Sequence, residues 1–267
     1  MFEISNLGIK YRGTDHWTLQ KVSFVANPGE ITLITGASGS GKSTLARALM
    51  TLIPKFYSAT SEGEILLDGQ EVNSLSRSEL IKLCGYVPQY PADFTTTLSV
   101  EEEIGQTLEN LGYLPEQILW RIDEVFTLLE IKHLRKKVQT ELSSGELQRV
   151  ALATAIAPDV PVLILDEPMA RIDLKSELLL VKILLDLAKR GKTIIAFEHR
   201  LDYLLSVVDK VVFLADGKVH SEGSPKDIIS NLVDVDIPEV SLIQINNDNK
   251  HPLSITEAEQ ILKQILH

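Results

Sequence analysis

A glycine-rich stretch at residues 36–43 carries the strongest chemical signal in the chain. It reads GASGSGKS and fits the P-loop pattern, with an apolar run before it and a helix-forming run after it. Glycines in such a loop let consecutive backbone N–H groups point at phosphate oxygens, and the following helix N-terminus adds partial positive charge. Lys42 supplies a cation for the outer phosphates, and Ser43 supplies a hydroxyl for Mg²⁺.

A chance glycine-rich turn is the alternative explanation of this loop. A random chain of this length would match the four specified positions on the order of once in a hundred, from average composition. We therefore expect a site for ATP and Mg²⁺ here. The residues expected to surround the nucleotide phosphates are Gly36, Ser38, Gly39, Ser40, Gly41, Lys42, Ser43 and Thr44.

Two adjacent carboxylates follow an apolar run in the second half of the chain. Residues 162–165 read VLIL, and Asp166 and Glu167 come directly after them. Carboxylates at the C-terminal end of a buried parallel strand lie where α/β folds bind ligands. An Asp-Glu pair after a strand is by itself usually a solvated turn. Combined with the P-loop, the pair predicts that Asp166 holds the water shell of Mg²⁺ and that Glu167 activates the attacking water.

A third motif lies between these two, at residues 142–149, which read LSSGELQR. A loop of small residues that opens a helix can bind an anion, here through Ser143 and the Gly145 N–H. An ordinary capped helix is the alternative. In its place between the other motifs, the segment resembles the signature sequence of ATP-binding cassette (ABC) proteins. That resemblance implies that Ser143, Gly145 and Glu146 complete the ATP site of a second subunit.

The same resemblance covers residues 1 to about 223 and implies roles for four further residues. Gln89 matches the glutamine that contacts Mg²⁺ and the attacking water, and His199 matches the histidine that contacts the γ-phosphate and orients Glu167. Tyr11 matches the aromatic residue that stacks on adenine, although an exposed tyrosine with no ligand is an alternative. Asp173 matches the loop that crosses between subunits.

Several positions depart from the usual ABC pattern. Ser144 stands where a second glycine is commonest, and Arg171 and Ile172 replace the small residue and leucine usual before Asp173. Arg200 follows His199 where Asp is frequent. None of these changes removes a catalytic group. They could alter the pairing of subunits, and Arg171 could favour pairing with a non-identical subunit.

The elements that must position these residues alternate between strands and helices. Dense apolar runs typical of buried parallel strands are interleaved with helical periodicity, which predicts an α/β fold with a mostly parallel core sheet. Strands are expected at 4–10, 19–25, 31–35, 63–69, 162–165, 193–197 and 210–214; helices at 44–52 (ended by Pro54), 100–108, 115–131, 145–157, 178–190 and 201–207. The resemblance adds the P-loop NTPase fold of the ABC type, an antiparallel β subdomain and a helical signature subdomain.

We expect an ABC ATPase domain at 1–223, with its helical subdomain at about 90–160, and a C-terminal extension at 224–267. A short helix should follow Pro225. Residues 254–266 form an amphipathic pattern with a capping box at Ser254 and Glu257. That apolar face could dock on its own domain or serve as a dimerisation element, and both alternatives stay open.

Composition narrows the functional classes. The chain has 267 residues, 44% hydrophobic and 24% charged, with a formal net charge of −11. This acidic balance argues against nucleic acid as a partner, which needs a basic face. The single cysteine, Cys84, permits no internal disulfide and fits a reduced setting. The start of the chain lacks a signal-peptide pattern, and no apolar run approaches the roughly 20 residues of a membrane helix.

Residues 90–104, YPADFTTTLSVEEEI, resemble the energising subunits of energy-coupling-factor (ECF) transporters, as do IPEV at 237–240 and LSITEAE at 253–259. Phe94 stands where Gln is common in that group. The resemblance implies a peripheral subunit at the cytoplasmic face of the membrane that energises import of a vitamin or transition-metal ion. Its partners would be a second ABC ATPase subunit, identical or homologous, a membrane scaffold and a substrate-binding membrane protein.

Other branches of the family stay in view. One is the ATPase of an ordinary importer that works with an extracytoplasmic binding protein. Another is a non-transport ABC ATPase that acts on nucleic acid or protein complexes. A cassette that binds ATP without hydrolysing it is disfavoured by the presence of Glu167 and His199.

Overall fold

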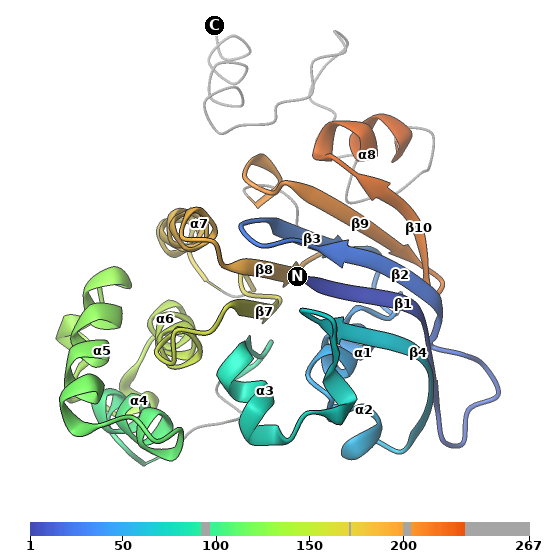
Figure 1. Ribbon diagram of the computed structural model, residues 1–267. Coiled ribbons are helices and arrows are strands. Elements are labelled where there is room, and N and C mark those ends of the chain that lie inside the picture. The colour runs from blue at the N-terminus through green and yellow to red at the C-terminus, as the bar shows by residue number, and fades with distance from the viewer. Residues whose placement is uncertain (92–96, 171, 200–203, 233–267) are drawn as a thin grey trace, which may run out of the picture.

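Two sheets and a layer of helices make up the described part of the chain (Figure 1). The computed structural model describes residues 1–91, 97–170, 172–199 and 204–232. Among these residues, no helix is both long and apolar enough to cross a membrane. The amphipathic segment at 254–266 and the departures at Phe94, Arg171 and Arg200 lie outside the described residues.

The core sheet has six strands in the order β10-β9-β3-β8-β7-β6. All neighbours are parallel except β9 and β10, which form an antiparallel hairpin. Every residue of β3, β7 and β8 is buried. This agrees with the sequence, in which dense apolar runs predicted strands covered on both faces. The strands are β3 (Ile31–Thr35), β6 (Cys84–Val87), β7 (Val162–Asp166), β8 (Thr193–Phe197), β9 (Lys210–Ala215) and β10 (Lys218–Gly223).

A second, antiparallel sheet has the order β2-β1-β4-β5. Its strands are β1 (Phe2–Tyr11), β2 (Leu19–Ala26), β4 (Ala59–Leu67) and β5 (Gln70–Glu71). The turn between β4 and β5 is the Asp68-Gly69 pair, with φ of 50° and 80°, as a type I′ hairpin requires. Helix α1 (Lys42–Leu49) packs with both sheets in one hydrophobic cluster that includes Phe2, Leu45 and Phe197.

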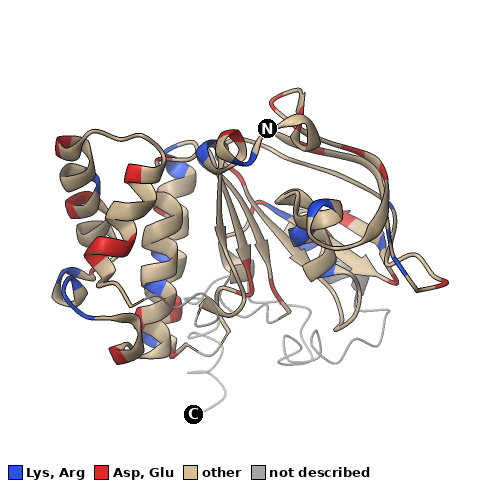
Figure 2. Ribbon diagram, turned by 90° about the horizontal axis from the view of Figure 1, so that it is seen from below, with Lys and Arg blue, Asp and Glu red and all other residues tan. Residues whose placement is uncertain are grey.

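The helical subdomain lies to one side of the core sheet (Figure 2). It comprises α4 (Val100–Asn110), α5 (Pro115–Leu128) and α6 (Ser144–Ile156). Helix α6 runs so close to β6 that a Cβ added at Gly85 would lie 2.4 Å from the carbonyl oxygen of Ala155. The apolar faces of these helices join β7 and α7 (Leu174–Lys189) in a second hydrophobic cluster. The fold class expected from the sequence is thus confirmed.

The local differences from the expected elements have physical reasons. The helix after the P-loop ends at Leu49, ahead of Pro54, because Thr51 adopts a left-handed φ of 52°; Pro54 falls in a short α2 (Leu52–Lys55). The expected 201–207 helix is described only as a 3-10 turn at Leu204–Ser206, and α8 (Pro225–Leu232) follows as expected.

Several short elements and edge strands were not predicted from the sequence. They include α3 (Arg77–Leu83), strands β5 and β10, and the 3-10 turns Val72–Ser74, Lys132–Leu134 and Gln139–Glu141. Strand β10 alternates exposed and half-buried residues and contains no dense apolar run, so it lacked the signal that marked the other core strands.

Candidate nucleotide-binding site

The P-loop surrounds an open cavity of about 330 Å³ at the junction of β3 and α1. Six of the eight expected phosphate-contacting residues line it, namely Ser38, Gly39, Gly41, Lys42, Ser43 and Thr44, together with Thr18, Glu167 and His199. Thr18 was not predicted to line the site, because it belongs to no recognisable sequence motif.

Gly36 and Ser40 are buried behind the loop and do not line the cavity. At Gly36 the φ is 148°, and an added Cβ would lie 2.1 Å from the carbonyl oxygen of Leu214 in β9. Only glycine fits such a close backbone approach. The Ser40 carbonyl accepts a hydrogen bond from Gly217 N at 3.2 Å, so the β9–β10 turn supports the loop from behind.

Lys42 lies at the first position of α1, and its side chain reaches back into the loop. Its Nζ donates hydrogen bonds to the carbonyl oxygens of Gly36 at 2.5 Å and Ala37 at 3.1 Å. These contacts place a buried ammonium group beside the N-terminus of α1. Two sources of positive charge therefore face one cavity, an arrangement that suits phosphate.

Asp166 ends β7 and is only 5% exposed. Its Oδ2 accepts a hydrogen bond from the Tyr86 hydroxyl at 3.4 Å, and its buried Oδ1 has no hydrogen-bond partner among the described residues. Burial, and then the neighbouring Glu167 charge, raise the pKa of this carboxyl to about 6. A carboxylate in this position is destabilised by its surroundings, and a nearby cation would offset that cost.

The residues expected to hold Mg²⁺ carry donor groups that suit this ion. The set combines the Ser43 hydroxyl, the Gln89 side-chain amide and the buried Asp166 carboxylate, all oxygen donors of the kind that Mg²⁺ prefers. Mg²⁺ usually takes only one or two protein carboxylates and completes its shell with water and phosphate oxygens. The unpartnered Oδ1 of Asp166 is the atom that such a shell would use.

Glu167 is brought together with the two other residues expected to catalyse. Gln89 Nε2 donates a hydrogen bond to Glu167 Oε2 at 2.6 Å, and His199 Nδ1 lies 3.7 Å from Glu167 Oε1. The three side chains come from the ends of β6, β7 and β8, which lie next to one another in the sheet. The parallel order of these strands thus explains why residues 110 positions apart meet at one edge.

The backbone at Glu167 is held in an uncommon conformation. Its φ is 50°, in the left-handed region that costs a non-glycine residue about 1 kcal/mol or more. Glu167 N donates to Phe197 O at 2.8 Å, and Ala170 N donates to Glu167 O at 3.0 Å. These bonds fix the turn that aims the carboxylate toward the cavity.

Glu198, which directly follows β8 and was not predicted from the sequence, supports this turn. It is 1% exposed, and its Oε1 accepts a hydrogen bond from Met169 N at 2.7 Å. Its own N–H donates to Ile34 O at 3.0 Å, beside the P-loop strand. An acidic residue directly after a fully apolar strand was the available signal, because a buried carboxylate must have partners.

The expected signature residues lie away from the cavity. Ser143 is exposed and caps α6, with its Oγ accepting from Glu146 N at 3.3 Å and Glu146 Oε2 accepting from Ser143 N at 2.8 Å. The Ser143 N–H holds the pKa of Glu146 below its usual range. Gly145 packs so closely against the start of α7 that an added Cβ would lie 2.7 Å from Ser176 Oγ.

Asp173 and Tyr11 also lie outside the set of cavity-lining residues. Asp173 is exposed and caps α7 by accepting hydrogen bonds from Ser176 N at 3.0 Å and Ser176 Oγ at 3.1 Å. The Tyr11 hydroxyl lies 3.2 Å from Thr44 Oγ1, so this half-buried ring stands next to the start of α1. The signature loop therefore does not line the P-loop cavity of its own chain.

Comparison with known proteins supports the family suggested by this geometry. Residues 19–170 match the family model described as ABC transporter. A putative ABC transporter ATP-binding protein of Clostridium tetani is 35% identical over 266 residues, which cover 99% of this chain and 58% of that protein. The chain spans about half the length of the curated relatives it matches first.

Solved structures of cassettes are similar as well. CbiO1 of Clostridium perfringens, described as part of the ABC transporter complex cbiONQ, is 28% identical, with a TM-score of 0.75 over 91% of this chain and 98% of that one. A dimeric bacterial ABC transporter cassette is 26% identical, with a TM-score of 0.74 over 84% and 99%. With the P-loop, the two carboxylates and the capped signature helix in place, the chain belongs to the ABC transporter family and carries its ATPase domain.

Proposed function

We propose that the chain binds and hydrolyses ATP to energise a membrane importer. The observation that carries the proposal is the meeting of Gln89, Glu167 and His199 at the edge of the P-loop cavity. Phosphate binding alone does not need these three side chains. A carboxylate placed between an amide and an imidazole suits the activation and orientation of a water molecule.

In this proposal each residue has a distinct task. The loop N–H groups and Lys42 bind the phosphates, and Glu167 accepts the proton of the attacking water. Gln89 and His199 orient Glu167, and His199 also faces the outer phosphate. Ser43, Gln89 and Asp166 would hold Mg²⁺, which neutralises phosphate charge when bound. Tyr11 would flank the adenine.

The active site is proposed to form between two cassettes. Ser143 and Gly145 lie at the start of α6, where N–H groups and the helix dipole favour an anion. Ser143 is exposed and Gly145 is buried, and neither lines the cavity of its own chain. A partner chain, identical or homologous, could place its γ-phosphate there. Glu146 and Asp173 would support that contact through their caps, and the extension from residue 224 would strengthen the pairing. The dimeric cassette with a similar fold supports this arrangement.

The importer is proposed to be of the ECF type, with a vitamin or a transition-metal ion as cargo. The ECF-like residues at 90–104 and the similarity to CbiO1 support this choice. The partners would then be a membrane scaffold and a substrate-binding membrane protein, with this chain at the cytoplasmic face. An ordinary importer would instead require an extracytoplasmic binding protein.

The test is assembly and transport. We expect the tagged chain, co-expressed with the membrane proteins encoded beside it, to co-purify with them and to drive uptake into ATP-loaded vesicles. Capture of an extracytoplasmic binding protein would indicate the ordinary importer. ATPase activity that is stimulated by DNA and unaffected by membrane partners would contradict the transport proposal.

Replacement of Glu198 tests how the catalytic turn is held. Glu198→Ala should lower kcat by about 10- to 100-fold with little change in KM for ATP, because misplacing a catalytic group by an ångström has that cost. Glu198→Gln keeps an oxygen acceptor for Met169 N and should retain most activity. Steady-state ATPase kinetics measure both variants. Equal loss in the two would show that the carboxylate charge, and not the hydrogen bond, is what matters.

A further inference from the structure

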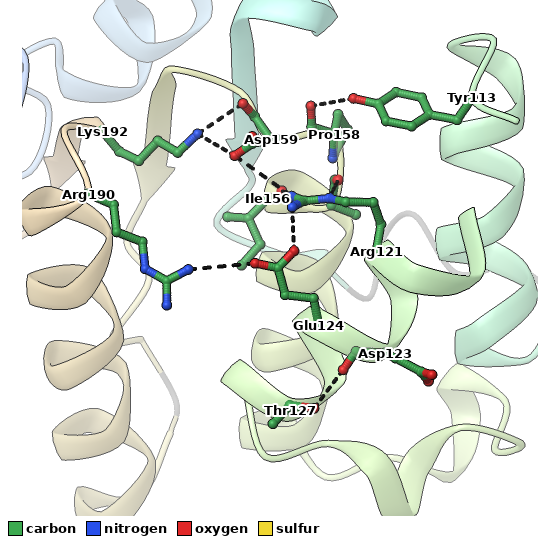
Figure 3. A network of polar contacts seen from close by, with 11 residues as sticks. Tyr113, Arg121, Asp123, Glu124, Thr127, Ile156, Pro158, Asp159, Arg190 and Lys192 are labelled. Atoms are coloured by element: carbon green, nitrogen blue, oxygen red, sulfur yellow. Dashed lines mark hydrogen bonds and ion pairs between the residues drawn. The ribbon is translucent and has the colours of Figure 1, made fainter. Parts of the chain in front are cut away.

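Side chains bind four successive carbonyls at the C-terminal end of α6 and directly after it, those of residues 156–159 (Figure 3). A helix leaves its last carbonyl oxygens without partners inside the helix. Here Arg121 donates from Nη2 to Ile156 O at 3.0 Å and from Nε to Ala157 O at 2.7 Å; Tyr113 Oη donates to Pro158 O at 2.7 Å, and Lys192 Nζ to Asp159 O at 2.9 Å.

These donors come from two parts of the fold. Arg121 lies on α5 and Tyr113 just before it, whereas Lys192 precedes β8 in the core. Figure 3 shows the Lys192 and Arg121 side chains converging on the same end of α6 from opposite sides. The helical subdomain and the core are therefore joined at this point through the end of a single helix.

Two carboxylates extend the junction. Glu124 on α5 accepts from Arg121 Nη1 at 2.5 Å and lies 3.7 Å from Arg190 Nη1, directly after α7. Asp159 Oδ1 accepts from Lys192 Nζ at 2.6 Å and lies 3.9 Å from Arg121 Nη2. Arg121 is the central group, because it contacts both carboxylates as well as two of the carbonyls.

The Arg121 side chain is only 9% exposed. Its planar guanidinium reaches two carbonyls and Glu124 at once, which the single ammonium of a lysine could not reproduce. The phosphate cavity does not include any residue of this junction. Its role in the protein is therefore not explained by contact with nucleotide.

The opposite end of α6 explains what the junction could control. That end begins at Ser143, the exposed cap of the signature loop. At 1.5 Å per residue, the 13 residues of α6 span about 20 Å, so a tilt of about 5° at the Arg121 end would move the signature loop by about 2 Å. A displacement of that size is large compared with the tolerance of a hydrogen bond to phosphate.

We propose that Arg121 is a positioning residue that sets the direction of α6 and thereby places Ser143 and Gly145 against the ATP of the partner cassette. The inference rests on the proposed pairing of two cassettes. It predicts an effect in trans. Loss of Arg121 weakens the site formed with the partner's P-loop and leaves the chain's own P-loop competent.

The first experiment measures the direction of α6 in the chain itself. Spin labels at Thr140→Cys and Lys218→Cys, both exposed, report the distance from the signature end to the core sheet in a Cys84→Ser background. We expect Arg121→Met to shift or broaden that distance by about 2 Å, the lever-arm estimate from the helix rise. Arg121→Lys is the milder variant in case the methionine variant folds poorly.

The matched control is Arg135→Met. Arg135 also pairs with two carboxylates of the helical subdomain, Asp123 and Glu101, but among the described residues it has no hydrogen bond or ion pair with the end of α6. Its distance distribution should equal that of the parent protein. An unchanged distribution in both Arg121 variants, or an equal change in the control, would overturn the proposal whatever the ATPase data show.

The second experiment tests the effect in trans. Arg121→Met keeps an intact P-loop, and Lys42→Ala keeps an intact signature loop, so a mixed pair contains one complete site. In a one-to-one mixture about half of the randomly formed pairs are mixed, and each mixed pair has one complete site where the parent pair has two. The mixture should therefore recover about a quarter of the parent ATPase rate. No recovery above the separate variants would show that the Arg121 defect acts in cis and would refute the proposal.

The two experiments separate this inference from the proposed function. If the parent chain forms no ATP-dependent pair with itself, identical pairing fails, and the spin-label distances alone decide whether Arg121 directs α6. If pairing and hydrolysis are normal but the distances do not respond to Arg121, the proposed function stands and the positioning role is wrong.

Discussion

Glu167→Gln should leave ATP binding intact and reduce turnover by about 10²- to 10⁴-fold, the usual contribution of a general base. Glutamine preserves the size of the side chain and an oxygen near Gln89 Nε2, but it cannot accept the proton of water. The cavity walls formed by the P-loop are unchanged by this substitution. ATP affinity, measured by a fluorescent analogue, and steady-state phosphate release give the two quantities.

The same variant should accumulate as a closed pair in the presence of ATP, which gel filtration detects. Glu62→Gln, at an exposed position of β4, serves as the control and should behave as the parent chain. Phosphate release by Glu167→Gln at the parent rate would show that another group accepts the proton, and the assignment of the base would then be abandoned.

Asp166→Asn should stabilise the metal-free protein while abolishing Mg²⁺-dependent turnover. The pKa of Asp166 is raised from 3.8 to about 6 by burial and by Glu167. Well below pH 3.8 the carboxyl is protonated in the folded and unfolded states, so the substitution has little effect on stability there. Above pH 6 the folded state holds a buried charge that the unfolded state solvates, and the parent chain is less stable by up to about 3 kcal/mol.

Thermal unfolding in a chelator at pH 4.5 and 7.5 measures this difference. We expect the melting temperature of Asp166→Asn to exceed that of the parent at pH 7.5 and to approach it at pH 4.5. Asp15→Asn, at an exposed position, should show no such pH dependence. Added Mg²⁺ and ATP should reverse the order. A variant that is less stable than the parent in chelator at pH 7.5 would contradict the electrostatic account.

Local sequence patterns were sufficient to predict most of the fold. The buried strands β3, β7 and β8 were found because parallel strands covered on both faces need uninterrupted apolar runs. Strand β10 was missed because an edge strand with alternating exposure, KVHSEG, carries no such run. Helix α1 ended earlier than expected because the left-handed φ of Thr51 breaks it, and propensity does not report that conformation.

The candidate site was predictable where chemistry coincides with a motif. The meeting of Gln89, Glu167 and His199 agrees with expectation, since each follows one of three neighbouring strands. Glu198 and Thr18 were not found, because one acts through a backbone N–H and the other lines the cavity without any pattern. The network around Arg121 could not be found either, because it joins residues far apart in the sequence through main-chain carbonyls.

The separation of the P-loop cavity from the exposed Ser143 loop has a kinetic consequence. In the proposed pair, an isolated chain holds nucleotide but lacks half of the groups around it. At low concentration the hydrolysis rate should then rise with the square of the protein concentration, not in proportion to it. A membrane scaffold that holds two cassettes together would remove this second-order dependence. Chains that are neither paired nor bound to a scaffold would therefore hydrolyse little ATP at low concentration.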